Sequence, residues 1–183
     1  MNWKGVFPAV TTKFHADGSL DMELFFKNID FQLESGVHGI ILGGTLGESS
    51  VLSQEEKITL TRETVKYLDG KVPVILNIAE GATQDALFWA AKAKELGAAG
   101  LMILPPMRYA ADAREVVAYF KAVANSTDLP IMIYNNPVDY KTLVTLDMFA
   151  ELVECENIEA IKESTRDISN VTRMRNRFGD RFK

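Results

Sequence analysis

The sequence predicts an α/β protein in which parallel strands alternate with helices, as they do in a (β/α)8 TIM barrel. Six short apolar segments contain β-branched residues and are bounded by glycine or proline, a pattern typical of strands buried on both faces. A helical segment follows each of them. The stretches ESGVHGIIL, from Glu34, and ELGAAGLMIL, from Glu95, repeat the same order of helix end, glycine stop and apolar strand.

The six strands and six helices can be assigned in chain order. The expected strands are GVFPAVTT (5–12), GIILGG (39–44), VPVILNI (72–78), GLMILPP (100–106), LPIMIYN (129–135) and IEAIKES (158–164). The expected helices cover residues 22–34, 54–68, 83–96, 113–124, 146–153 and 168–178. Ser53 in SQEE and Thr145 in TLDM are typical N-cap residues and mark two of the helix starts.

Strict alternation leaves a barrel or an open doubly wound sheet as the main architectures. No G-x-G-x-x-G motif follows the first strand, which disfavours the dinucleotide-binding open sheet. A full barrel needs eight units and typically about 250 residues, whereas this chain has 183 residues. We therefore expect residues 1–183 to be the N-terminal part of a single truncated barrel domain, with 181–183 beginning a seventh unit.

Composition argues against several functional classes. The net charge of −5 and the pI near 5.1 disfavour a nucleic-acid partner. No apolar stretch approaches the roughly 18 residues that a membrane span requires, so no membrane partner is expected. The single cysteine, Cys155, and the two histidines, His15 and His38, provide no disulfide framework and no metal site. A reducing, cytoplasmic location fits best.

The carboxyl ends of parallel strands form the usual ligand site of such folds, so the polar residues there are the candidates. They are Thr11, Thr12, Thr45, Glu48, Asn77, Arg108, Tyr109, Tyr134, Asn135, Asn136, Lys162 and Glu163.

Lys162 is the centre of this set, because an apolar strand tolerates an unpaired ammonium group poorly. A lysine inside a barrel loses its proton more easily than in water, where its pKa is about 10.4. The neutral amine can attack a 2-oxo acid and form an imine, which makes bond cleavage or proton loss at the neighbouring carbon feasible. Tyr134, one strand earlier at the same end, is placed to move protons.

Each candidate also has a structural interpretation. Lys162 could extend its ammonium group to solvent or pair with Glu163 or Glu48, and Tyr134 could simply cap the core. YNNP could be an Asn-Pro turn, and GGTLGE a tight turn without a ligand. In the functional interpretation, the glycines let backbone N–H groups approach a carboxylate and Thr45 adds a hydroxyl donor. Glu48 is then expected to hold the loop.

The motifs GGTLGES, YNNP and IKES, preceded by FPAVTTKF, resemble the family of Schiff-base lyases that includes dihydrodipicolinate synthase and N-acetylneuraminate lyase. The resemblance runs from about Val6 to the last residue. It implies a barrel, usually tetrameric, without a metal or organic cofactor. It also implies that Lys162 forms the imine with pyruvate or another 2-oxo acid. The expected catalytic residues are Lys162, Tyr134 and Thr45, and the expected substrate-binding residues are Gly44, Thr45, Thr11 and Asn136.

Three positions depart from members that make dihydrodipicolinate. Leu46 stands where they carry a second hydroxyl, Met107 falls where an intersubunit tyrosine is expected, and Asp139 replaces a carboxylate-binding arginine. Tyr109 is a candidate substitute for that tyrosine, although its register is shifted.

We therefore expect a catabolic aldolase, dehydratase or deaminase that acts on one 2-oxo acid or cyclic imine acid. Dihydrodipicolinate synthase proper is the alternative enzyme, and a non-catalytic barrel that binds 2-oxo acids, or an inert fragment, is the alternative outside catalysis.

Overall fold

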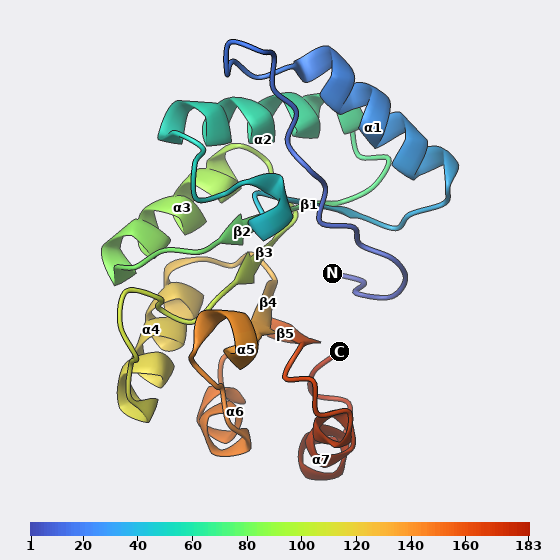
Figure 1. Ribbon diagram of the computed structural model, residues 1–183. Coiled ribbons are helices and arrows are strands. Elements are labelled where there is room, and N and C mark those ends of the chain that lie inside the picture. The colour runs from blue at the N-terminus through green and yellow to red at the C-terminus, as the bar shows by residue number, and fades with distance from the viewer.

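The computed structural model describes residues 1–183 and contains one curved sheet of parallel strands with helices along its outer side (Figure 1). The strands pair in chain order, β1-β2-β3-β4-β5. Their bounds are β1 Ile40–Leu42, β2 Val74–Ile78, β3 Gly100–Ile103, β4 Ile131–Asn135 and β5 Ile158–Glu163. Helical crossovers joining parallel neighbours are the connections expected of a (β/α)8 barrel.

The six expected helices are confirmed to within about two residues, the usual uncertainty of a helix end. They are α1 Met22–Glu34, α2 Gln54–Leu68, α3 Thr83–Glu95, α4 Ala113–Ser126, α6 Leu146–Leu152 and α7 Ser169–Phe178. Ser53 and Thr145 accept the N-cap hydrogen bonds that the sequence predicted. Two short helical turns lie in the motifs for which turns were considered: the 3-10 turn η1, Thr45–Gly47, in GGTLGE, and α5, Pro137–Tyr140, after YNN. They follow β1 and β4 and lie at the carboxyl end of the sheet. No helix combines the length and apolar character needed to cross a membrane.

The prediction of a full first strand over residues 5–12 was wrong. This segment runs parallel to β1, but only one bridge, Ala9 with Ile41, forms between them. Val10 donates to the Ile41 carbonyl at 3.1 Å, and Ile41 donates to the Pro8 carbonyl at 2.9 Å. Pro8 has no N–H, so the ladder cannot continue toward the N-terminus.

At the other edge of the sheet, the chain after α7 returns to β5. The Lys183 amide donates to the Glu159 carbonyl, and the Ile161 amide donates to the Lys183 carbonyl, both at 2.9 Å. This is a parallel pairing of the kind that the sequence predicted for 181–183. In Figure 1 the C-terminus accordingly ends beside β5.

The two faces of the sheet bury different side chains, because successive residues of a strand alternate between faces. The outer face packs under the helices in the main core. A smaller inner cluster contains Ile41, Ile75 and Met102, with Trp3 and other aromatic residues packed against it. The Trp3 indole N–H donates to Glu159 at 2.7 Å, so the N-terminal segment crosses the inner face (Figure 1).

Candidate active site

Lys162 and Tyr134 lie side by side on the inner face. They are register partners in the β4–β5 pairing, and Nζ of Lys162 lies 4.0 Å from the centroid of the Tyr134 ring. The ammonium group therefore faces the negative face of an aromatic ring, a favourable cation–π arrangement. The alternative of a salt bridge from Lys162 to Glu163 or Glu48 was wrong. The carboxylate of Glu163 binds other groups, and the exposed carboxylate of Glu48 pairs with no cation.

The YNNP motif forms the expected turn and also positions Tyr134. Asn136 caps α5, with its Oδ1 accepting from the Asp139 amide at 3.3 Å and Pro137 in the first helical turn. Its Nδ2 donates to the Tyr134 hydroxyl at 3.1 Å and to the Asp139 carboxylate at 2.8 Å. Asn136 is buried, and it holds the phenol of Tyr134 in a fixed direction.

The GGTLGE turn is held from two sides. Gly43 adopts a φ of +62°, which favours glycine. The Asn77 side-chain amide donates to the Gly43 carbonyl at 2.7 Å, and the Thr12 hydroxyl donates to the Gly47 carbonyl at 2.6 Å. Glu48 contributes through its backbone, which accepts from Val51 and Leu52, and its exposed carboxylate makes no hydrogen bond. Glu48 therefore holds the loop, as expected, and does so through its backbone carbonyl.

Thr45 is linked to Tyr134 through a residue that the sequence analysis did not identify. The Thr45 and Tyr140 hydroxyl groups are hydrogen-bonded, and the Tyr140 ring meets the Tyr134 ring edge to face, with centroids 5.7 Å apart. Burial raises the pKa of Tyr140, and Tyr134 and Asp139 add to the effect, while the Thr45 hydrogen bond opposes it. The usable signal was the YNNP turn itself, which folds position 140 back onto position 134.

Two other candidates lie apart from this cluster. The exposed Thr11 hydroxyl accepts from Lys13 at 2.7 Å and makes no hydrogen bond to the other predicted site residues. Tyr109 is 59% exposed, and its hydroxyl donates to Glu115 on α4 at 3.1 Å. Tyr109 therefore lies outside this cluster within its own chain, and its role as a substitute for the intersubunit tyrosine stays a prediction.

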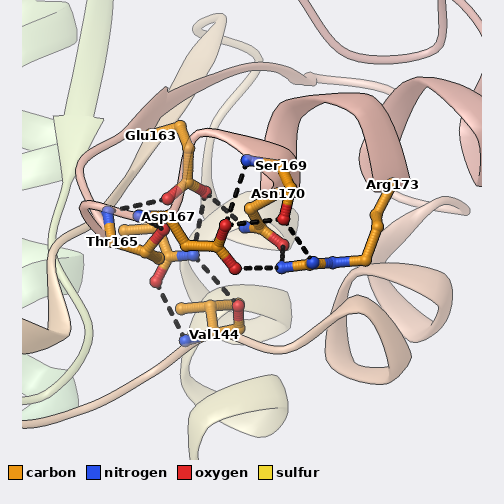
Figure 2. Close-up of polar contacts among 8 residues, drawn as sticks. Val144, Glu163, Thr165, Asp167, Ser169, Asn170 and Arg173 are labelled. Carbon is orange, nitrogen blue, oxygen red and sulfur yellow. Dashed lines mark hydrogen bonds and ion pairs between the residues drawn. The ribbon is translucent and has the colours of Figure 1, made fainter.

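Glu163 fixes the end of β5 through its carboxylate (Figure 2). Its carboxylate accepts from the side-chain amides of Asn135 and Asn170 at 3.2 and 2.8 Å and from the Thr165 amide at 2.8 Å. Asn135 also exchanges hydrogen bonds with the backbone of Val144, at 3.0 and 3.1 Å. The residue that follows Lys162 thus ties β5 to β4 and α7.

Two cavities border the Lys162–Tyr134 pair. One of about 480 Å³ at the carboxyl end is bordered by Tyr134, Asn136, Asp139 and the loop after β5. The other, of about 280 Å³, is bordered by Lys162 and the apolar side chains of Trp3, Phe7 and Met132. An amine, a phenol and a bonded pair of hydroxyl groups therefore converge at the open end of a parallel sheet. Such a set can form an imine and move protons around it.

Comparison with known proteins supports this description. The dihydrodipicolinate synthetase family profile matches residues 2–183. A 4-hydroxy-tetrahydrodipicolinate synthase of Shewanella sp. (strain W3-18-1) is 34% identical over 179 residues, covering 98% of this chain and 61% of the relative. The chain thus spans about three fifths of the length of the curated relatives that it matches.

Solved structures show the same relation. Dihydrodipicolinate synthase from Aquifex aeolicus superposes with a TM-score of 0.94 at 34% identity, covering 99% of this chain and 62% of that one. YagE, a prophage protein of E. coli K12 in complex with pyruvate, gives a TM-score of 0.90 at 28% identity, covering 95% and 59%. The fold is therefore that of about the first six units of a (β/α)8 barrel, and the chain belongs to the dihydrodipicolinate synthetase family.

Proposed function

We propose that this protein is a lyase that acts on a 2-oxo acid through an imine on Lys162. The observation that carries the proposal is the position of the Lys162 amine. It lies on the inner face of the sheet, 4.0 Å from the ring of its register partner Tyr134, with no carboxylate paired to it. A lysine held only for stability would gain more from a carboxylate or from solvent.

The first step is addition of the neutral Lys162 amine to the substrate ketone. The nitrogen forms a bond to C2 while the second electron pair of the carbonyl bond moves to oxygen, and that oxygen takes the proton lost from nitrogen to become a hydroxyl group. One further proton converts that hydroxyl to water, which leaves as the C2=N bond of a cationic imine forms. Tyr134, held by Asn136, is the proposed donor of this proton. The resulting imine accepts the electron pair of a bond broken at C3.

Substrate binding is proposed for Gly44 and Thr45, at the turn after β1. Backbone N–H groups of a glycine turn and a threonine hydroxyl are suitable donors for a carboxylate. Asn136 and Thr11 were predicted to bind substrate as well. Asn136 fits an indirect role, because it holds the Tyr134 hydroxyl. A substrate contact by Thr11 stays a prediction.

The proposed substrate has a single carboxylate and is cleaved, dehydrated or deaminated. Asp139 borders the cavity at the carboxyl end of the sheet and is 58% exposed. A second substrate carboxylate would meet this negative charge, which the Arg166 guanidinium offsets from 3.9 Å. The competing function, condensation of pyruvate with aspartate semialdehyde, is favoured by the names of relatives 34% identical to this chain. A tetramer, a cytoplasmic location and a single barrel domain over residues 1–183 stay predictions.

Borohydride trapping tests the proposal. The protein at its native length is incubated with pyruvate and borohydride and then digested, and the adduct is located by mass spectrometry. We expect the adduct on the peptide with Lys162 and its loss in Lys162→Met. The matched control is Lys141→Met, which removes an exposed lysine that donates to the Val138 carbonyl and should leave the adduct intact. An adduct on Lys141 or Lys13 would contradict the assignment.

A substrate panel separates the two enzyme functions from a binding barrel. The protein is offered pyruvate with aspartate semialdehyde, and separately 2-keto-3-deoxy sugar acids and hydroxy-pyrroline carboxylate. Turnover on the panel supports the catabolic lyase. Efficient condensation of the first pair alone would establish the synthase, and trapping without any turnover would establish a binding protein.

A further inference from the structure

Tyr140 contacts both Thr45 and Tyr134 and has no role in the function proposed above. Its hydroxyl is bonded to that of Thr45 on η1, and its ring lies edge to face against Tyr134 of β4. Two loops far apart in the sequence therefore meet at this side chain. In Figure 1 the turn η1 and helix α5 lie at the ends of β1 and β4 that carry the site.

The backbone around Tyr140 is arranged to keep it there. The Tyr140 amide donates to the Asn136 carbonyl at 3.1 Å, so α5 is a single closed turn. The next residue, Lys141, adopts a backbone φ of +64°, a value that residues other than glycine rarely adopt. Such a conformation typically costs about 1–3 kcal/mol and concentrates at functional sites. The chain thus maintains a strained turn where Tyr140 folds back onto Tyr134.

The Tyr134 hydroxyl accepts from Asn136, so its own proton stays free to pass along a chain of hydroxyl groups. The Tyr109 hydroxyl is bonded to Glu115, and Leu46 follows Thr45 without a hydroxyl. Burial raises the pKa of Tyr140, so its phenol stays protonated near neutral pH and has a proton to donate. Thr45 is exposed and opens the pair to solvent.

We propose that Tyr140 is a relay residue of the Lys162 imine site, which with Thr45 carries protons between the Tyr134 side of the cavity and solvent within one chain. The proposal rests on the proposed function, since it needs an imine on Lys162. Tyr140 acts through Thr45 and Tyr134 and forms no bond to the substrate.

The step that Tyr140 serves is proton exchange at C3 of the imine. With pyruvate, a C3–H bond breaks, its electron pair forms the C2=C3 double bond, and the C2=N pair returns to nitrogen. A site hydroxyl takes the proton while passing its own proton onward along the chain of hydroxyl groups, and the last proton leaves to water. The reverse sequence returns a proton from solvent to C3. Charge and electrons balance without an oxidant or reductant.

The test measures two steps separately on the protein at its native length. In D2O, loss of the pyruvate methyl signal in the proton NMR spectrum reports exchange at C3, and borohydride trapping reports imine formation. Tyr140→Phe should slow exchange by at least about tenfold, toward the effect of a positioned acid–base group, while trapping stays within twofold of wild type. The matched control is Tyr67→Phe, which removes a hydroxyl that donates to Asp30 on α1, away from the site, and should change neither rate.

Thr45→Val supplies an independent readout. If both hydroxyl groups form one path, Tyr140→Phe adds less than twofold to the loss of exchange in a Thr45→Val background, because coupled residues are not additive. Exchange in Tyr140→Phe equal to that in Tyr67→Phe would overturn the relay. A loss of trapping in the same proportion as the loss of exchange would overturn it as well. Absence of any wild-type adduct would refute the proposed function itself, and the relay with it.

Discussion

Replacing Glu163 with Ala tests whether the network at the end of β5 supports the site. In the folded protein this carboxylate accepts from the side-chain amides of Asn135 and Asn170 and from the Thr165 amide (Figure 2). Asn135 and Asn170 are only 0% and 8% exposed. Water therefore reaches their amide groups poorly once the carboxylate is gone.

The expected loss follows from which donors are left without an acceptor. Asn135 keeps its bond to Val144, whereas the Asn170 Nδ2 and the Thr165 amide have no other acceptor. A buried donor left unsatisfied costs about 1–3 kcal/mol. Since Glu163 is itself half-buried, we expect a total loss of about 2–4 kcal/mol. With a urea m-value of about 2 kcal/mol/M, the unfolding midpoint should fall by about 1–2 M.

Urea unfolding, followed by far-UV circular dichroism, measures the loss. Glu163→Gln retains one acceptor oxygen and should fall between wild type and Glu163→Ala. The matched control is Glu156→Ala, at an exposed glutamate with no hydrogen bond or ion pair, which should change the free energy of unfolding by less than about 0.5 kcal/mol. Borohydride trapping on Lys162 should slow in Glu163→Ala, because the adjacent backbone loses its anchor. A midpoint equal to that of Glu156→Ala would refute the reasoning.

Further expectations concern the site, a buried ion pair and the sheet edge. Tyr134→Phe should keep the fold and lower turnover on the true substrate by about 10²–10⁴; unchanged turnover would return Tyr134 to core packing. Lys57 is buried beneath the Trp89 ring and pairs with Glu80 at 3.2 Å, with side chains 5% and 23% exposed. Glu80→Gln should destabilise by about 2–4 kcal/mol by leaving a buried ammonium unpaired, whereas Lys57→Met should be neutral or stabilising; the reverse order in urea would contradict this. Burial lowers the pKa of Lys57 from its ordinary value of 10.5. The destabilisation caused by burying its ammonium group is therefore complete below the folded-state pKa and disappears as the pH rises to 10.5. Any advantage of Lys57→Met should therefore shrink over that window, and a constant difference would exclude the burial cost. The 183-residue chain by itself should associate on size exclusion, since β5 is paired at its outer edge only by Lys183; a cooperatively melting monomer would oppose this.

The sequence by itself determined most of the elements and the position of the two principal candidate residues, Lys162 and Tyr134. Apolar runs bounded by glycine or proline, and helices with capping residues such as Ser53, are local patterns, and local patterns encode secondary structure. Strand and helix alternation then restricts the topology to a few parallel arrangements. Lys162 and Tyr134 could be placed at one end of neighbouring strands because both belong to segments whose direction in the sheet follows from that alternation.

Only the tertiary structure decided what each side chain contacts. Pairing along residues 5–12 fails because Pro8, which has no N–H, lies where the ladder to β1 needs a hydrogen-bond donor. Which residue lies at that place depends on the register between the two segments. Glu163 faces Asn135 and Asn170 while Lys162 faces Tyr134, because neighbouring residues of a strand point to opposite faces. The Thr45–Tyr140 contact joins residues 95 positions apart. No local pattern specifies such a contact, since it forms only when the sheet brings the ends of β1 and β4 to the same edge.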